Sequence, residues 1–141
     1  MKVHPYLNFD GKAEEAFNFY KSIFGGEFST IMKMTDAPGS DQLTEEEQNR
    51  IMHISLPITS QITLMASDIM PSAGQKLNLG NQTYIMLNPE NKEEADRLFN
   101  GLSKGGNVEM PMEEQFWGDY FGSFTDKYGI MWMINCFGKQ P

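Results

Sequence analysis

Apolar and polar residues alternate along this chain with two different periods, and each period predicts one kind of element. In the segments 12–24 and 91–104 the apolar residues recur every three to four positions, the spacing of one face of a helix. Elsewhere, short apolar stretches bounded by turn residues indicate strands. The predicted strands lie near 3–9, 27–36, 50–58, 61–68, 83–88, 107–115, 119–126 and 130–137.

The order of these elements repeats once, at a distance of 80 residues. The dipeptide Leu-Asn occurs at 7–8 and at 87–88, and Gly-Gly occurs at 25–26 and at 105–106. Each half of the chain therefore reads strand, helix, strand, strand, strand. The period is too long, and the copies too few, for a solenoid. The pattern favours two duplicated modules; an unrelated pair of strand–helix units is the alternative.

Two modules of this kind predict an α+β protein with mixed or antiparallel sheets. The chain reads as a single domain, 1–141, with module 1 at about 1–68 and module 2 at about 82–137. The segments 36–50 and 71–81 are rich in Gly, Pro and polar or acidic residues, so we expect them to be loops.

Composition narrows the classes of function. Of the residues, 40% are apolar and 21% are charged, and the net charge is −8, which is typical of a soluble globular protein. The 11 Lys and Arg residues are scattered, so we expect no nucleic-acid partner. No apolar run approaches the roughly 20 residues of a membrane span, and the N-terminus lacks signal-peptide features. A cytoplasmic protein is therefore predicted, and Cys136, the single cysteine, is interpreted as a small buried residue.

Two segments together carry a resemblance to a known family. They are YLNFDGKAEEAFNFYKSIFGGEF, residues 6–28, and FWGDYFGSFTDKYGIMWMIN, residues 116–135. The pair resembles the vicinal oxygen chelate superfamily, which includes glyoxalase I, bleomycin-resistance proteins and extradiol dioxygenases. Within it the pair is most similar to the PhnB-like branch, often labelled 3-demethylubiquinone methyltransferase. The resemblance implies two βαβββ modules that curl their sheets around a ligand cavity, usually in a homodimer.

The resemblance also implies a divalent metal held by the first and last strands of each module, commonly by two His and two Glu. Only the first of these positions matches, at His4. The others fall on Tyr84, on Met133 and on Met65 or Ala66. Thioether sulfur and neutral phenol are poor ligands for Zn²⁺ or Mg²⁺, so no cofactor and no catalytic metal are expected. His53, the other histidine, is interpreted as a hydrogen-bonding strand residue.

Strand alternation groups the candidate ligand-binding residues by face. It places His4, Tyr6 and Asn8 on one face of the first strand, and it places His53 on the same face as Ile51. The predicted lining of the cavity is His4, Tyr6, His53, Met65, Tyr84, Trp117, Tyr120 and Met133. A lining of methionine and aromatic side chains favours a small apolar or aromatic ligand. The faces assigned to the cavity offer no Lys or Arg for an anion such as a phosphonate.

The aromatic ending of the chain has two interpretations. Trp117, Phe121, Phe124 and Trp132 either form a wall for a flat ligand or fill the core. We expect the core interpretation to hold for at least half of them. The glycines among them would permit bends and close backbone approach.

Two functions from different classes remain open. The first is metal-free binding of a small apolar or aromatic molecule. The second is an enzyme of the glyoxalase or dioxygenase type, with His4 or His53 as base or metal ligand. A carboxylate beside either histidine would favour the enzyme, and Asp68 is the candidate. A methyltransferase would want a strand, a glycine-rich loop and a helix, whereas the Gly-Gly pairs follow predicted helices.

Overall fold

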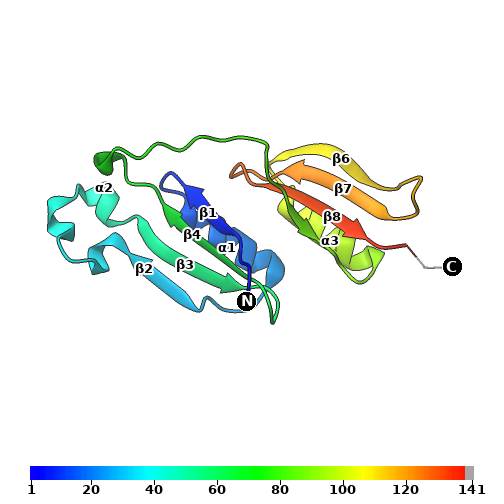
Figure 1. The fold of residues 1–141 in the computed structure, drawn as a ribbon, viewed down its shortest axis with the longest axis horizontal. Helices are drawn as coiled ribbons and strands as arrows, with labels where there is room; N and C mark the ends of the chain where they lie inside the picture. The colour runs from blue at the N-terminus through cyan, green and yellow to red at the C-terminus, as the bar shows by residue number, and fades with distance from the viewer. Residues whose placement is uncertain (139–141) are drawn as a thin grey trace. The chain divides into compact units, whose positions relative to one another are not determined.

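The structure is a computed structural model in which residues 1–138 are described. It divides into two compact units, the first comprising Met1–Asn78 and the second beginning at Leu79 (Figure 1). Each unit is described by itself. The boundary lies in the segment that connects the two predicted modules.

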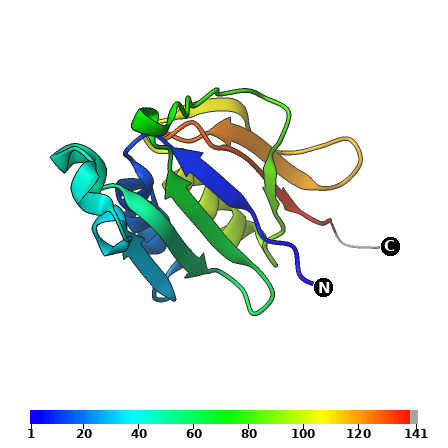
Figure 2. The ribbon, with the colours of Figure 1, turned by 60° about the vertical axis from the view of Figure 1, so that its left-hand side comes forward.

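The first unit holds one main helix, several short helical turns and a four-stranded sheet in the order β1-β4-β3-β2 (Figure 2). Its strands are β1 (Tyr6–Phe9), β2 (Thr30–Lys33), β3 (Ile51–Pro57) and β4 (Thr63–Asp68), and its main helix is α1 (Ala13–Phe24). Strands β1 and β4 are parallel, whereas the other neighbours are antiparallel. The sheet is therefore mixed, as predicted.

The second unit repeats this arrangement, with the strand order β5-β8-β7-β6. Its elements are β5 (Ile85–Leu87), α3 (Lys92–Leu102), β6 (Asn107–Glu114), β7 (Tyr120–Thr125) and β8 (Met131–Cys136). Strands β5 and β8 are parallel, in the positions of β1 and β4. The sequence of exposed, half-buried and buried residues along 1–10 is identical to that along 81–90. The α+β class and the βαβββ order of each half are confirmed.

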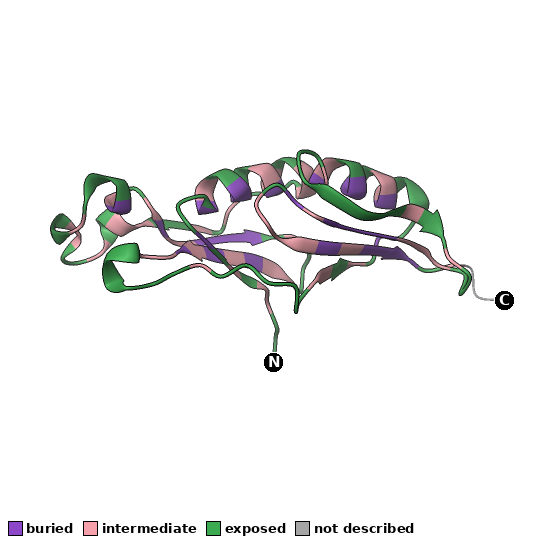
Figure 3. Cartoon of the chain, turned by 90° about the horizontal axis from the view of Figure 1, so that it is seen from above, coloured by how far each residue is buried: buried purple, intermediate pink, exposed green. Residues whose placement is uncertain are grey.

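In each unit the helix covers one face of its own sheet and buries the apolar side chains there (Figure 3). Under α1 the fully buried residues include Ile54, Leu56 and Leu64. Phe99 of α3 packs edge-on against Phe124, with ring centroids 5.0 Å apart. A Cβ at Gly122 would lie 2.8 Å from Cε2 of Phe99, so only glycine permits the helix to approach β7 this closely.

The aromatic ending divides between core and surface. Phe124 and Trp132 are fully buried, whereas Trp117 remains 50% exposed and Phe121 is half-buried. Cys136 is buried at the end of β8, which confirms its interpretation as a small buried residue. The core interpretation therefore holds for two of the four aromatic residues considered.

The segment 36–50, predicted to be a loop, contains short helical turns instead. They are η2 (Ser40–Gln42) and α2 (Glu45–Gln48), and η1 (Met34–Asp36) replaces the end of the strand predicted over 27–36. Thr44 caps α2 by accepting a hydrogen bond from the backbone N–H of Glu47. Three consecutive acidic residues fall in its first turn, where the helix dipole favours negative charge. Segment 71–81 begins with η3 (Pro71–Ala73) and is otherwise irregular.

Among residues 1–138, no helix has the length and apolar character needed to cross a bilayer.

Candidate ligand-binding site

The face of the first sheet turned away from α1 carries most of the chemistry predicted for the first unit. We call it the helix-free face. The residues on this face, which pair with one another across the strands, are Tyr6, Asn8, Thr30, Met32, His53, Ser55, Met65 and Ser67. Tyr6 and Met65 are direct partners across β1 and β4, and Met32 lies opposite His53. Alternation along four strands therefore brings three predicted residues, Tyr6, His53 and Met65, to one face.

Tyr6 and His53 form a stacked, hydrogen-bonded pair on this face. The Tyr6 hydroxyl lies 3.1 Å from Nδ1 of His53, and the two rings are stacked with centroids 5.7 Å apart. Tyr6 is 49% exposed, so the pair is accessible from the helix-free side. His53 is thus a hydrogen-bonding strand residue, as the sequence indicated.

His4 precedes β1 and is held by the β4 backbone. Its Nδ1 accepts a hydrogen bond of 3.0 Å from the backbone N–H of Thr63. A nitrogen that accepts from an N–H carries no proton itself, so the neutral His4 ring has its proton on Nε2. The histidine inherited from the metal-site pattern is therefore used as an acceptor within the fold.

A bulge in β3 changes which side chains reach the helix-free face. Met32 pairs with His53 but the next residue, Lys33, pairs with Ile51, so β3 carries one extra residue, Met52. Ile51 is 1% exposed and lies in the core. The prediction that Ile51 shares the face of His53 is therefore wrong, because strict alternation does not hold across a bulge.

A cavity of about 430 Å³ opens at the bulge. It is lined by Asn8, Met34, Met52, Ser67, Asp68, Ile69, Met70, Gln75 and Lys76. We call it the methionine cavity. Its volume lies in the range of small-molecule sites, roughly 300–1,000 Å³. Sequence reasoning missed its three methionines and missed Lys76, which comes from a loop and not from the strand faces that were expected to offer no Lys or Arg.

The loop after β4, residues 69–76, supplies four of the cavity residues. One signal in the sequence could have located it: because β1 and β4 are parallel, segments that follow them meet at the same edge of the sheet. The loop is polar and directly follows β4, so its side chains fall beside the end of β1. The sequence analysis considered no residue of this loop after Asp68 as part of the site.

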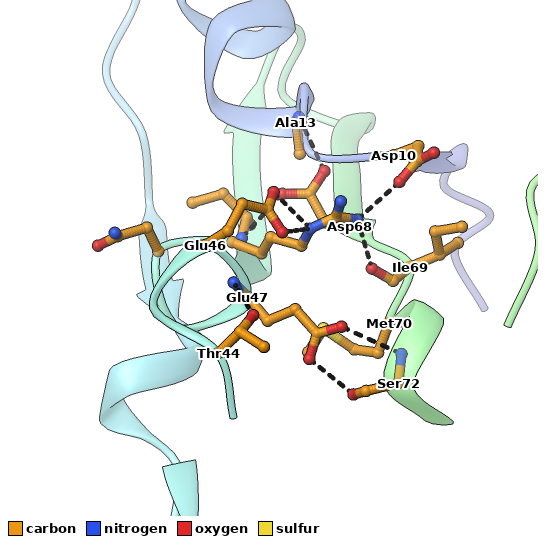
Figure 4. Close-up of polar contacts among 12 residues, drawn as sticks. Asp10, Ala13, Thr44, Glu46, Glu47, Asp68, Ile69, Met70 and Ser72 are labelled. Carbon is orange, nitrogen blue, oxygen red and sulfur yellow. Dashed lines mark hydrogen bonds and ion pairs between the residues drawn. The ribbon is translucent and has the colours of Figure 1, made fainter. Parts of the chain in front are cut away.

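Hydrogen bonds from Arg50 and to Glu47 hold this loop in place (Figure 4). The guanidinium of Arg50 donates to the carbonyl oxygen of Ile69 at 2.9 Å and to Oδ1 of Asp10 at 2.8 Å. Burial opposes the charge of Arg50, but its bonds to Asp10 and Glu46 outweigh burial and raise its pKa. The buried carboxylate of Glu47 accepts from the backbone N–H and the hydroxyl of Ser72, at 3.0 and 2.6 Å.

Asp68 anchors the floor of the cavity to the core. Its two carboxylate oxygens accept the backbone N–H groups of Ala13, at 3.0 Å, and of Ile51, at 2.9 Å. The side chain is 5% exposed. Asp68 therefore fixes the start of α1 and of β3, and it is not the carboxylate that would orient a catalytic histidine.

The other predicted site residues belong to the second unit. Tyr84, at the position equivalent to His4, donates its hydroxyl to Glu109 at 2.8 Å, and this hydrogen bond is the main reason that its pKa is raised. Met133 lies opposite Met86 on β5 and opposite Ser123 on β7. Met133 thus lies in the second sheet at the place that Met65 takes in the first.

Trp117 and Tyr120 do not share a face with Met133. Trp117 lies in the connection between β6 and β7, with its ring edge-on to Phe116 at 5.0 Å. Tyr120 lies on the α3 side of β7 and donates to Asp96 at 2.6 Å; this hydrogen bond is the largest cause raising the pKa of Tyr120 to about 12. Such a phenol stays protonated and is a poor proton donor to a ligand.

A second cavity, of about 540 Å³, lies in the second unit beside Tyr120 and the start of α3. The ammonium group of Lys92 lies over the Tyr120 ring, 5.3 Å from its centroid, and forms an ion pair with Glu114. The ammonium group of Lys92, the basic group of this cavity, is therefore already paired with a carboxylate. Among residues 1–138, no three or more His, Cys, Asp or Glu side chains are grouped to hold a metal ion.

Comparison with known proteins extends over nearly the whole chain. Residues 1–135 match the profile of the family described as 3-demethylubiquinone-9 3-methyltransferase. Protein YjdN of Escherichia coli (strain K12) is 33% identical over an alignment that covers 100% of this chain and 99% of that protein. Both matches include the two segments that carried the resemblance.

Solved structures agree with this assignment. Protein PA1353 from Pseudomonas aeruginosa is 37% identical, with a TM-score of 0.86 and coverage of 99% of both chains. The PhnB protein from Bacillus cereus is 28% identical, with a TM-score of 0.77 over 96% of this chain and 99% of that chain. A glyoxalase/bleomycin resistance protein from Albidiferax ferrireducens T118, 16% identical with a TM-score of 0.65 over 98% of this chain and 97% of that chain, shares the fold. The chain belongs to the family described as 3-demethylubiquinone-9 3-methyltransferase.

Proposed function

We propose that this protein binds a small molecule with an apolar or aromatic body in the methionine cavity, without a catalytic metal. The observation that carries the proposal is the cavity itself, in which Met34, Met52 and Met70 come from three different parts of the chain. Methionine side chains are flexible and polarisable, so they adapt to irregular or flat apolar surfaces. The Tyr6–His53 pair does not line this cavity but offers an accessible ring surface on the helix-free face of the same sheet.

The hydrogen bonding of His4 supports a metal-free site. A metal bound at Nε2 of a neutral histidine requires the proton to be on Nδ1. Nδ1 of His4 accepts from the N–H of Thr63, which leaves no room for that proton. Tyr84 donates its hydroxyl to Glu109 and so is held as a neutral phenol.

The arrangement of Asp68 supports binding over acid–base catalysis. An enzyme with His4 or His53 as general base would gain from a carboxylate that orients the ring. Both oxygens of Asp68 are used by the N–H groups of Ala13 and Ile51. Both Gly-Gly pairs follow helices: Gly25 is the C-cap of α1, and Gly105-Gly106 come after Ser103, the C-cap of α3. Neither pair lies between a strand and a helix as a cofactor cradle would, so the methyl-transfer chemistry in the family's description gains no support from them.

Binding is tested with the neutral dye N-phenyl-1-naphthylamine, whose fluorescence rises in apolar surroundings. We expect saturable binding to the wild-type protein and about tenfold weaker binding to Met52→Ala. The dye loses its contact with one methionine side chain, which costs on the order of 1.4 kcal/mol of binding free energy. Met110→Ala, at an exposed methionine of β6, is the matched control and should bind as the wild type does. Absence of saturable binding, or equal losses in the two variants, would contradict the proposal.

The metal-free part of the proposal is tested by elemental analysis. Protein purified without chelator is expected to contain far less than one equivalent of any divalent transition metal, and His4→Ala should leave that content unchanged. Each missing strong ligand weakens a metal site by a large factor, and one histidine alone holds no such ion. Near-stoichiometric metal that disappears in His4→Ala would overturn the proposal and favour the enzyme with His4 as a metal ligand.

A further inference from the structure

The lining of the methionine cavity holds polar side chains as well as methionines. We propose that the ligand carries an anionic oxygen group, bound by Lys76 together with Asn8 and Ser67, while its apolar body contacts the methionines. This inference rests on the proposed function and names the class of ligand: an amphipathic oxyanion with a flat or aliphatic body. The ligand's charge would then lie at the end of β1 and β4.

Three polar side chains in the cavity lining have no internal partner. Asn8 and Ser67 are direct neighbours across β1 and β4. Lys76 reaches the same cavity from the loop after η3. Within residues 1–138, none of these three side chains has a hydrogen-bond or ion-pair partner. An amide N–H, a hydroxyl and an ammonium group can all donate, and together they suit a carboxylate or a similar oxyanion.

The second unit shows that the fold itself does not require such unpaired groups. Asn88 lies at the position equivalent to Asn8, and its amide donates to the carbonyl oxygen of Asn135 at 2.9 Å. Asn135 follows Ile134, the partner of Leu87 in the register, just as Ser67 follows Ala66, the partner of Leu7, and the amide of Asn135 donates to Asp119 at 3.0 Å. The same two positions are thus satisfied internally in one unit and left free in the other.

The acidic groups near the cavity have hydrogen-bond or ion-pair partners, whereas the ammonium group of Lys76 has none among residues 1–138. Asp10 and Glu46 pair with the guanidinium of Arg50. Glu47 is bound to Ser72, and the oxygens of Asp68 accept backbone N–H groups. Lys76 is the basic residue of the cavity lining, so its ammonium group is the place where an anionic oxygen would bind.

The network around Arg50 and Glu47 makes Lys76 available at this place. Because Arg50 holds the carbonyl oxygen of Ile69 and Glu47 holds Ser72, the loop is tied to the rest of the unit at two points before it reaches Lys76. Within the loop, Oε1 of Gln75 accepts from the backbone N–H of Met70 at 2.6 Å, which closes the loop on itself next to Lys76. A positioned donor loses less freedom on binding than one on a loose loop.

The test uses two dyes that differ by one charged group. 1-Anilinonaphthalene-8-sulfonate has the ring system of N-phenyl-1-naphthylamine with a sulfonate added. We expect Lys76→Gln to weaken binding of the sulfonate dye about tenfold and to leave binding of the neutral dye unchanged. Lys104→Gln, at an exposed lysine of the second unit, is the matched control and should alter neither affinity. Displacement of the sulfonate dye at lower concentrations of 2-naphthoate or 2-naphthyl phosphate than of naphthalene-2-methanol would support the inference and identify the preferred oxyanion.

The outcomes separate this inference from the proposed function. If the neutral dye binds in a Met52-dependent way and Lys76→Gln leaves binding of the sulfonate dye unchanged, the inference of an anionic group is wrong and the proposed apolar binding site is supported. An equal loss of sulfonate-dye binding in Lys76→Gln and Lys104→Gln also overturns the inference, since it indicates a general charge effect. If neither dye saturates on the wild-type protein, the proposed function falls together with the inference. Near-ultraviolet circular dichroism of each variant confirms that its fold is intact.

Discussion

Replacing Trp132 by alanine is expected to lower the free energy of unfolding by about 3–5 kcal/mol, the range for removing a large buried aromatic side chain. Trp132 is fully buried in β8. Its indole Nε1 donates to Oδ2 of Asp126 at 2.9 Å, and Oδ1 of Asp126 accepts from the backbone N–H groups of Tyr128 and Ile130 at 2.8 and 3.0 Å. The substitution therefore leaves a cavity and removes one donor from a buried carboxylate.

Urea unfolding followed by far-ultraviolet circular dichroism measures this loss. Trp132→Phe should cost less, about 1–3 kcal/mol, because the ring volume is largely kept while the bond to Asp126 is lost. Trp117→Ala is the matched control, since Trp117 is half exposed and its removal should cost less than that of Trp132. A loss in Trp117→Ala as large as that in Trp132→Ala would contradict the assignment of Trp132 as the main aromatic of this core.

Asp68→Ala is the second substitution expected to have a large effect. It removes the acceptor for the N–H groups of Ala13 and Ile51, both buried bonds. Each buried N–H left without a partner costs about 1–3 kcal/mol, so the free energy of unfolding should fall by about 2–6 kcal/mol. Native-state hydrogen exchange should show the Ala13 and Ile51 amides losing more protection than amides in β8.

Asp41→Ala is the control for this substitution. Asp41 lies exposed in η2, so its loss should change the free energy of unfolding by no more than about 0.5 kcal/mol. The comparison separates the removal of a carboxylate in general from the removal of these two bonds. Equal effects of Asp68→Ala and Asp41→Ala would show that Asp68 does not anchor α1 and β3.

Local periodicity was sufficient for the elements and for the repeat. The stripe of apolar residues along α1 and α3 predicts both helices, because one turn of helix brings residues three and four apart to the same side. Alternation along β1, β3 and β4 predicts that Tyr6, His53 and Met65 face the same way, and the register confirms this. These features depend on neighbouring residues and on a period, both of which the sequence contains directly.

Alternation alone was not sufficient for the aromatic ending. Tyr120 and Met133 were expected in one ligand wall, yet Tyr120 lies on the α3 side of β7 and bonds to Asp96, while Met133 pairs with Ser123 on the opposite face. The sequence supplies two faces for each strand. Which face a helix covers is decided by packing, here by Phe99 against Phe124 and Gly122.

The sequence by itself determined the βαβββ order of each half, the helix stripes and the face shared by Tyr6, His53 and Met65. Only the tertiary structure decided what surrounds that face: the bulge at Met52, the return of the loop after β4 with Lys76, and the use of Nδ1 of His4 by Thr63. The physical reason is distance along the chain. Periodicity relates residues a few positions apart, whereas the contacts that build the methionine cavity join residues that meet only when parallel strands come side by side.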